Sequence, residues 1–138
     1  MGFKRHYFKQ YNFMLTKISG EINDNDLSLH VEDMNQAADG LINLKELADC
    51  REITIINLTT QGTTNNASDE NNKPGSKLAI LTPVDNVMIL AMARAYQIFS
   101  EDNRESVGLF QDFDEAMVWL TDDNAIEKKA LTLLINST

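Results

Sequence analysis

The sequence predicts an α/β fold with a mixed, mostly parallel sheet of about five strands and about four or five helices. Three patterns support this: an opening hairpin, a short apolar strand at residues 77–82, and amphipathic helix patterns that alternate with strand patterns. The chain has 138 residues, a typical size for one domain. We therefore expect a single domain over residues 1–138, with residues 122–138 as a C-terminal helical extension.

The first elements are an expected hairpin and an expected helix. Residues 4–22 place apolar side chains among polar ones on either side of a turn near residues 10–12. Asp24 or Asn25 is then placed to cap a helix that Gly40 ends. The apolar positions of this helix recur at three- and four-residue steps: Leu27, Val31, Met34, Ala37 and Ala38.

The middle of the chain is ambiguous and the end is clearer. Residues 41–50 and 51–60 both have the composition of strands, and residues 59–75 have that of an unusually long loop. Residues 77–82 form an almost wholly apolar strand pattern, followed by the longest helix pattern at about residues 86–100. A strand is expected at residues 107–110. Two more helices are expected, one beginning at Asp112 or Asp114 and one over residues 125–135.

Several phrases resemble the SpoIIAA-like (STAS-like) domain family. The strand KLAILTP, a helix with Ala93-Arg94-Ala95-Tyr96, and the phrases VGLF and FDEAMVWL are similar to the C-terminal half of such domains. Ile18-Ser19-Gly20 and the segment ELADCREIT, residues 46–54, are similar to the first half. The resemblance spans residues 5–121. It implies that residues 43–50 form the central strand and residues 57–71 a helix, which its Thr, Asn, Gly and Ser residues should keep short or frayed.

Charge and composition exclude some classes of partner. The formal net charge is −9, which disfavours phosphate backbones, so we expect no nucleic-acid partner. The first 17 residues contain four basic residues and no acidic one, a polarity that suits either an edge strand or head-to-tail and homodimer contacts. One cysteine, no apolar leader and no long apolar run predict a cytoplasmic protein without membrane insertion.

The residues that usually carry catalysis or bind metals do not form a recognisable pattern. His6, His30 and Cys50 lie on three separate expected elements. Pairs of acidic residues, Asp69 and Glu70 among them, are placed at helix ends or on polar faces, where the helix dipole and solubility explain them. No glycine-rich phosphate loop is present. We therefore expect no catalytic residue, no metal ligand and no cofactor.

The carboxyl ends of the expected strands form a candidate binding rim, because ligands of open α/β sheets collect at such ends. The rim consists of Asp49, Arg51, Thr54, Thr82, Asp85 and Asn86. Arg94, on the longest helix, is a guanidinium that could pair with Asp49, hold an anion or extend along the surface.

The resemblance also implies a regulatory site next to this rim. In the anti-sigma-factor-antagonist branch of the family, a D-S-S-G motif at the start of a helix supplies a hydroxyl that a partner kinase phosphorylates. The matching positions here are Asn57, Leu58, Thr59 and Thr60, with Gly62 displaced by two. Of the motif's features, this sequence retains only a hydroxyl, at Thr59 or Thr60. The alternative is that these two threonines are helix-capping or surface residues.

Two function hypotheses follow. The first is a non-enzymatic protein-interaction or regulatory domain that uses the rim. The alternative is a small-ligand or lipid-binding domain with an apolar pocket beneath the 86–100 helix, since SpoIIAA-like folds are distantly similar to CRAL-TRIO lipid-binding domains. The apolar residues of the last helix either pack on the domain's own sheet or contact a partner or second copy.

Overall fold

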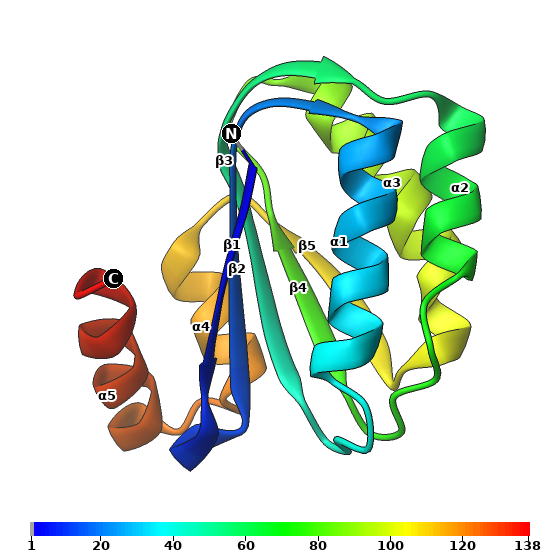
Figure 1. Ribbon diagram of the computed structural model, residues 1–138. Coiled ribbons are helices and arrows are strands. Elements are labelled where there is room, and N and C mark those ends of the chain that lie inside the picture. Colours follow the sequence, from blue (N-terminus) through cyan, green and yellow to red (C-terminus); the bar gives the residue numbers. More distant parts are fainter. Residues whose placement is uncertain (1) are drawn as a thin grey trace.

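A computed structural model describes residues 2–138 as a five-stranded sheet with helices on both faces (Figure 1). The elements in chain order are β1 (Gly2–Phe8), a 3-10 turn (Lys9–Tyr11), β2 (Phe13–Asn23), α1 (Asp24–Ala37), β3 (Lys45–Asn57), α2 (Thr60–Ser68), β4 (Lys77–Leu81), α3 (Val87–Ser100), a second 3-10 turn (Glu101–Asn103), β5 (Ser106–Phe110), α4 (Phe113–Leu120) and α5 (Ala125–Asn136). This arrangement confirms the predicted α/β class.

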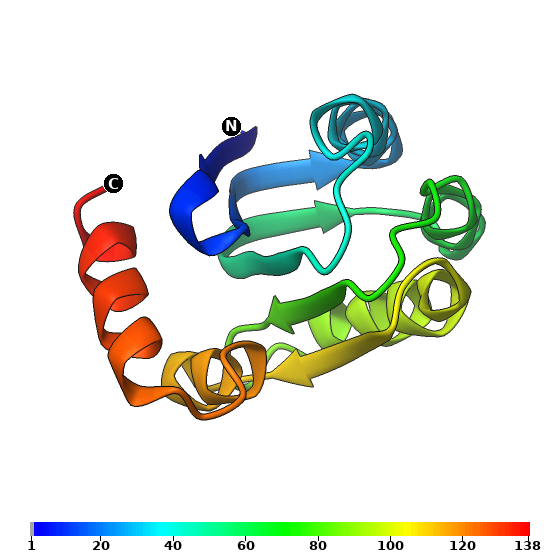
Figure 2. The same ribbon diagram turned by 90° about the horizontal axis from the view of Figure 1, so that it is seen from below.

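The strands follow one another across the sheet in the order β1-β2-β3-β4-β5. β1 pairs with β2 in antiparallel fashion, and every other neighbouring pair is parallel. The helices α1, α2 and α3 cover one face of the sheet, and α4 and α5 cover the other (Figures 1 and 2). β1 is therefore an edge strand, as the basic N-terminal segment allowed.

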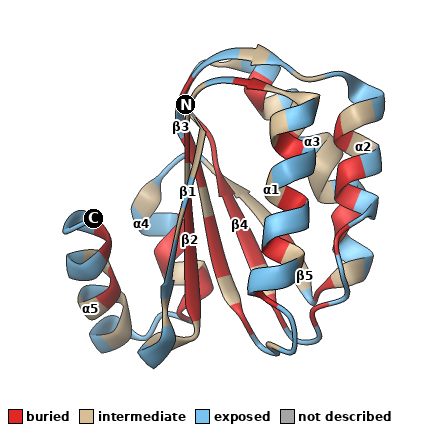
Figure 3. Ribbon diagram, in the orientation of Figure 1, coloured by how far each residue is buried: buried red, intermediate tan, exposed pale blue. Residues whose placement is uncertain are grey.

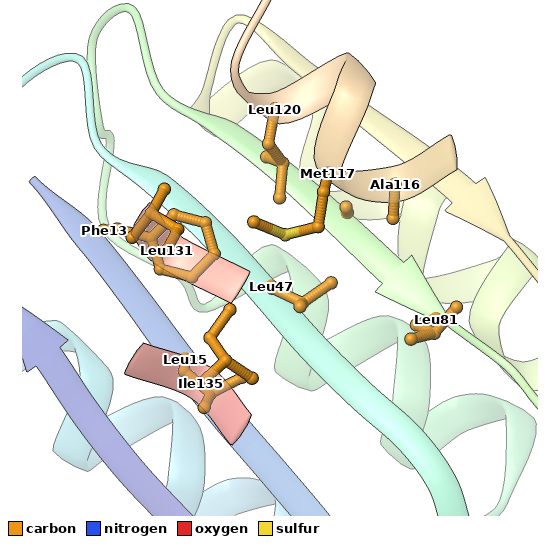
Figure 4. Packing of buried hydrophobic residues seen from close by; sticks show 10 residues of the cluster. Phe13, Leu15, Leu47, Leu81, Ala116, Met117, Leu120, Leu131 and Ile135 are labelled. Atoms are coloured by element: carbon orange, nitrogen blue, oxygen red, sulfur yellow. The ribbon is translucent and has the colours of Figure 1, made fainter. Parts of the chain in front are cut away.

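Successive side chains of each strand point to opposite faces of the sheet, so the domain has one apolar core on each face. The face toward α4 and α5 is closed by aliphatic and aromatic side chains from three strands and both helices (Figure 4). Met117 and Leu120 of α4 and Leu131 of α5 are all fully buried there. The complete cluster is Phe13, Leu15, Leu47, Ala79, Leu81, Ala116, Met117, Leu120, Leu131 and Ile135.

The last helix therefore packs on the domain's own sheet through one side. Leu131 and Ile135 belong to the same cluster as Phe13 and Leu15 of β2. Other apolar side chains of α5 face solvent, with Ile126 at 85% and Leu133 at 63% exposure. Residues 122–138 thus contribute to the core of the domain.

The opposite face carries a second apolar cluster together with buried polar groups. Ile18 and Ile22 of β2, Ile53 of β3, and Ile89 and Ala93 of α3 lie in this cluster. Buried residues line the inner sides of α1, α2 and α3, while their outer sides are exposed (Figure 3).

Some boundaries differ from the sequence predictions. The residue that caps α1 is Asn23 rather than Asp24 or Asn25. The Asn23 side chain accepts a hydrogen bond from the Asp26 N–H, and the Asp26 carboxylate accepts one from the Asn23 N–H, so the two residues form a capping box. β3 does not end at residue 50 but continues to Asn57, since residues 52–57 still pair with β2. α2 is short, as its composition predicted.

Candidate functional site: a cavity between the sheet and three helices

A cavity of about 100 Å³ lies between the sheet and the helices α1, α2 and α3. Most of its wall is apolar. The apolar lining includes Ile18 and Ile22 of β2, Leu27, Val31 and Met34 of α1, Cys50, Ile53 and Ile56 of β3, Leu78 and Ile80 of β4, and Ile89, Met92 and Ala93 of α3. The helix of residues 87–100 thus roofs an apolar cavity, at the position that the alternative hypothesis anticipated.

A group of buried charged residues, here called the charged floor, forms another part of the cavity wall. It comprises Glu46, Glu70, Lys73 and Arg104, each less than 9% exposed, together with the hydroxyl of Tyr96. Arg104 donates from one terminal nitrogen to Glu46 and from the other to Glu70. Tyr96 also donates to Glu70. Two cations and two carboxyl groups are therefore held together out of water.

Three separate segments bring Glu46, Glu70, Lys73 and Arg104 together at the amino ends of β3, β4 and β5. Glu46 is in the second position of β3. Glu70 and Lys73 follow α2, and the Lys73 N–H donates to the Asn103 carbonyl at 2.6 Å, which joins this segment to the one before β5. Arg104 lies two residues before β5. The floor is therefore held by backbone contacts between loops as well as by its own ion pairs.

Burial sets the protonation of Glu70. Loss of water around the carboxyl raises the pKa of Glu70 to about 8, with Glu46 acting in the same direction and Lys73 opposing it. Burial therefore opposes the two ion pairs that the Glu70 carboxyl makes with Lys73 and Arg104, and both of its oxygens accept hydrogen bonds, one from Arg104 and the other from Tyr96.

His30 of α1 also lines the cavity, and it is neutral. Burial and, to a smaller extent, the nearby positive charges of Arg5, Lys73 and Arg104 together lower the pKa of His30 to about 3. Its ring stacks on Phe3 with the centroids 4.5 Å apart. Its Nδ1 lies 3.1 Å from a terminal nitrogen of Arg5 on β1.

The thiol of Cys50 lies in the apolar part of the wall. Burial and, to a smaller extent, the neighbouring Asp49 together raise the pKa of Cys50 to about 12. A thiol with such a pKa stays protonated at neutral pH and is a poor nucleophile. Cys50 therefore acts as an apolar side chain here.

The predicted rim residues do not meet in this cavity. Asp49 and Arg51 lie on the α4 and α5 side, where the Arg51 side chain donates twice to the Asp49 carboxylate, at 3.0 and 2.9 Å. The expected pair between Arg94 and Asp49 is not formed, because Arg51 occupies Asp49 and Arg94 is exposed on α3. The Arg51 guanidinium also lies 5.6 Å from the centroid of the Phe113 ring.

The other rim residues have structural contacts or face solvent. Thr82 is fully buried beside the Phe110 carbonyl, and Asn86 caps α3 by accepting from the Ile89 N–H at 3.0 Å. Asp85 is exposed with a φ of 68°, and Thr54 is exposed on β3. The function of this rim as a binding site stays a prediction.

The threonines at the position of the family's phosphorylation motif differ from one another. Thr59 caps α2: its hydroxyl donates to Asp24 of α1 at 2.6 Å and accepts from the Gly62 N–H at 2.9 Å. A Cβ at Gly62 would overlap the same Asp24 carboxylate, so glycine permits this close approach of α1 and α2. Thr60 is exposed in the first turn of α2, and Asn57 donates to Glu21 at 2.9 Å.

Sequence reasoning missed the charged floor. It placed Glu70 at a solvated helix end, which is wrong: Asp69 is exposed, but Glu70 is buried against Arg104. For Glu46 the sequence did contain a sign of burial, because this residue lies within a strand pattern beside apolar residues. Lys73 and Arg104 carried no such signal, since both lie in polar turn segments.

Among residues 2–138, no group of three or more His, Cys, Asp or Glu residues is arranged to hold a metal ion. No helix in this part of the chain is long and apolar enough to span a bilayer.

Comparison with solved structures places the fold in the SpoIIAA-like class. The chain is similar to an uncharacterised protein of the DUF3478 family with a SpoIIAA-like fold from Shewanella loihica PV-4, with a TM-score of 0.54. The two share 15% sequence identity, and the similarity covers 86% of this chain and 94% of the other. The predicted fold is thereby confirmed. No family model and no curated protein matches the sequence.

Proposed function

We propose that this SpoIIAA-like domain is a non-enzymatic binding domain that takes up a small, largely apolar molecule beneath α3. The observation that carries this proposal is the cavity of about 100 Å³ between the sheet and α1, α2 and α3. Protein interiors are close-packed, and voids larger than one water molecule are few. The apolar side chains around this space lack packing partners on one side, which favours a binding role.

The size of the cavity limits the ligand. An engineered apolar cavity of roughly 150 Å³ binds benzene or xenon, whereas pockets for drug-sized molecules begin at about 300 Å³. The volume of the cavity described here is closer to that of the engineered cavity than to that of a drug pocket. The ligand is therefore a small molecule of about six heavy atoms. Longer chains would require α1, α2 or α3 to move away from the sheet.

The chemistry of the wall supports binding rather than catalysis. The Cys50 thiol has a raised pKa, and the His30 imidazole is held neutral by burial and by nearby positive charge. Neither group is therefore activated as a nucleophile or poised as a base near neutral pH.

Xenon is an apolar atom, so its binding tests whether the cavity takes up a ligand without any polar group on that ligand. Crystals pressurised with xenon should show the atom between α3 and the sheet, and methyl NMR should show shifts at Ile18, Ile53 and Ile89. Ala93→Leu, which places a larger side chain in the cavity wall, should abolish both signals. An unoccupied cavity in the unsubstituted protein would end the proposal.

One observation favours a second candidate, a protein-interaction domain at the carboxyl end of the sheet. β4 pairs with β3 only over residues 45–49, so the rest of β3 has a free edge to which a partner strand could add. Near this end Ile55 is 52%, Met88 54% and Val87 81% exposed. Ile55→Asp and Val87→Asp should then abolish recovery of a specific partner, while Leu133→Asp on α5 should not.

A further inference from the structure

An open hollow of about 340 Å³ lies on the α4 and α5 side of the sheet, apart from the cavity beneath α3. Its wall is formed by Lys17 of β2, Asp49 and Arg51 of β3, Phe113 of α4 and the C-terminal half of α5. Its volume is at the lower end of the range of small-molecule sites, which begins at about 300 Å³. We propose that this hollow binds a small organic phosphate, whose phosphate group contacts Arg51 and Lys17.

The Arg51 guanidinium is held in a fixed orientation. Asp49 accepts from its Nε at 3.0 Å and from its Nη2 at 2.9 Å, and its central carbon lies 5.6 Å from the centroid of the Phe113 ring. Within residues 2–138, the Nη1 donors have no hydrogen-bond partner. The Arg51 side chain is 45% exposed, so an anion in the hollow can reach these donors. A guanidinium that is already oriented loses less conformational entropy when it binds a phosphate.

The register of the strands places two further cations beside Arg51. Lys17 follows Leu15, which is buried against α4 and α5, by two residues and therefore points to the same face of the sheet. Lys4 of β1 is directly opposite Lys17 and shares that face. Neither lysine has an ion-pair partner within residues 2–138. Like charges directly opposite one another on two strands are unfavourable, so an anion at Lys17 would relieve their repulsion.

The charge of this group favours a dianion over a monoanion. Lys4, Lys17 and Arg51 carry three positive charges, and Asp49 is the only carboxylate among residues 2–138 that borders the hollow. Two positive charges are therefore in excess. A phosphate monoester carries a charge of about −1.5 to −2 at pH 7 and has three acceptor oxygens, whereas a carboxylate carries a single charge. Three oxygens also suit a guanidinium and an ammonium that approach from different strands.

The rest of the wall accommodates the organic part of the ligand. The Phe113 ring and Ile135 supply apolar surface, and Thr132 and Asn136 of α5 supply polar surface. A bare phosphate ion would leave these side chains without a contact. The organic group therefore adds affinity to that of the phosphate alone.

Four probes separate the preference for a phosphate from the preference for an organic group. Phenyl phosphate, benzoate and benzylammonium share one ring and differ as dianion, monoanion and cation, and inorganic phosphate lacks the ring. The titrations are followed by amide NMR at pH 7.5 in a low-salt buffer, because salt screens exposed charges. Phenyl phosphate should bind at least tenfold more tightly than benzoate or inorganic phosphate, and benzylammonium should not bind. The shifts should centre on Lys17, Arg51 and Phe113.

Three charge-removing variants locate the site. Arg51→Gln and Lys17→Gln each remove one cation from the hollow, and each should weaken phenyl phosphate binding at least fivefold. Lys9→Gln removes the same charge from the exposed turn between β1 and β2, and should change the affinity less than twofold. All three side chains are at least partly exposed, so the variants should keep the fold.

Several results would overturn the proposal. Benzoate binding as tightly as phenyl phosphate would show that the hollow does not select a phosphate, and equally tight binding of inorganic phosphate would show that the organic group plays no part. If Lys9→Gln weakens binding as much as Arg51→Gln does, the attraction is a general effect of charge. The hollow is not a site if phenyl phosphate fails to bind. The cavity beneath α3 is tested separately by xenon and Ala93→Leu.

Discussion

The two faces of the sheet are built in different ways. Toward α4 and α5, the side chains of Phe13, Leu15, Met117, Leu120 and Leu131 are at most 1% exposed and form a closed apolar core, with an open polar hollow that includes Asp49 and Arg51 at its margin. Toward α1, α2 and α3, a similar number of apolar residues surrounds a cavity with a charged floor. The closed face has the packing expected of a core that only stabilises the fold.

The difference suggests a division of roles within one small domain. A buried ion cluster contributes little net stability, because the desolvation of its charges offsets their attraction. The face that carries the floor therefore gives up stability that a fully apolar core would provide. The closed face supplies the stability on which the cavity depends. Four experiments on particular residues follow in order of decreasing expected effect, and a fifth then compares the two faces directly.

Breaking the charged floor should have the largest effect. Arg104→Met leaves Glu46 and Glu70 buried without their guanidinium, and should lower the free energy of unfolding by about 3–5 kcal/mol. Arg51→Met is the matched control on the other face, where the pair with Asp49 is partly exposed and should be worth about 1 kcal/mol or less. Urea unfolding of both variants measures the difference, and equal losses would contradict a buried floor.

Opening the closed core should cost nearly as much. Leu131→Ala removes a fully buried side chain from α5 and should cost about 2–5 kcal/mol. Leu133→Ala, on the same helix but 63% exposed, should change the free energy of unfolding by about 0.5 kcal/mol or less. If urea unfolding gives the same value for both variants, α5 does not belong to the core.

The pH dependence of stability should report on Glu70. Its folded pKa of about 8 lies above its ordinary value of 4.5, so the folded protein binds more protons than the unfolded chain between these values. The contribution of Glu70 to stability is therefore complete at low pH and is lost as pH rises toward 8, by at most about 1.4 kcal/mol per pH unit. His30 has an opposite effect, but only below about pH 6.5.

The window from pH 7 to 8.5 therefore isolates Glu70. Unfolding free energy should decline across it in the unsubstituted protein and stay level in Glu70→Gln. A decline of the same slope in both proteins would assign it to another group.

The smallest effect is expected at the start of α2. Thr59→Ala removes the cap that accepts from the Gly62 N–H and the hydrogen bond to Asp24, and should cost about 1 kcal/mol. Thr60→Ala, at the neighbouring exposed position, should be nearly neutral. Thermal unfolding of the two variants distinguishes a cap from a surface threonine, and a larger loss from Thr60→Ala would contradict the assignment.

Local patterns were enough to predict most of the elements. The apolar run at residues 77–81 and the helix of residues 87–100 are recognisable because each pattern is continuous in the sequence. The end of β3 was not predicted, although its alternating residues 52–57 have strand character, because it depends on pairing with the distant β2. Sequence composition could not decide that pairing.

The site itself was harder to predict than the fold. The position of a pocket beneath the 86–100 helix was anticipated, but its charged floor was not. Glu46, Glu70, Lys73 and Arg104 come from segments that lie up to 58 residues apart. Each of these side chains alone has the polarity of a surface residue, and only the folded arrangement shows that they are buried together.

The most direct test compares two alanines that face the sheet from opposite sides. Ala116 of α4 belongs to the closed core, and Ala93 of α3 lines the cavity. Ala116→Leu should lower the free energy of unfolding by about 1–3 kcal/mol through overpacking, whereas Ala93→Leu should fill space and change it by less than about 1 kcal/mol or raise it. If Ala93→Leu costs as much as Ala116→Leu, the α1, α2 and α3 face is as closed as the other and holds no ligand cavity.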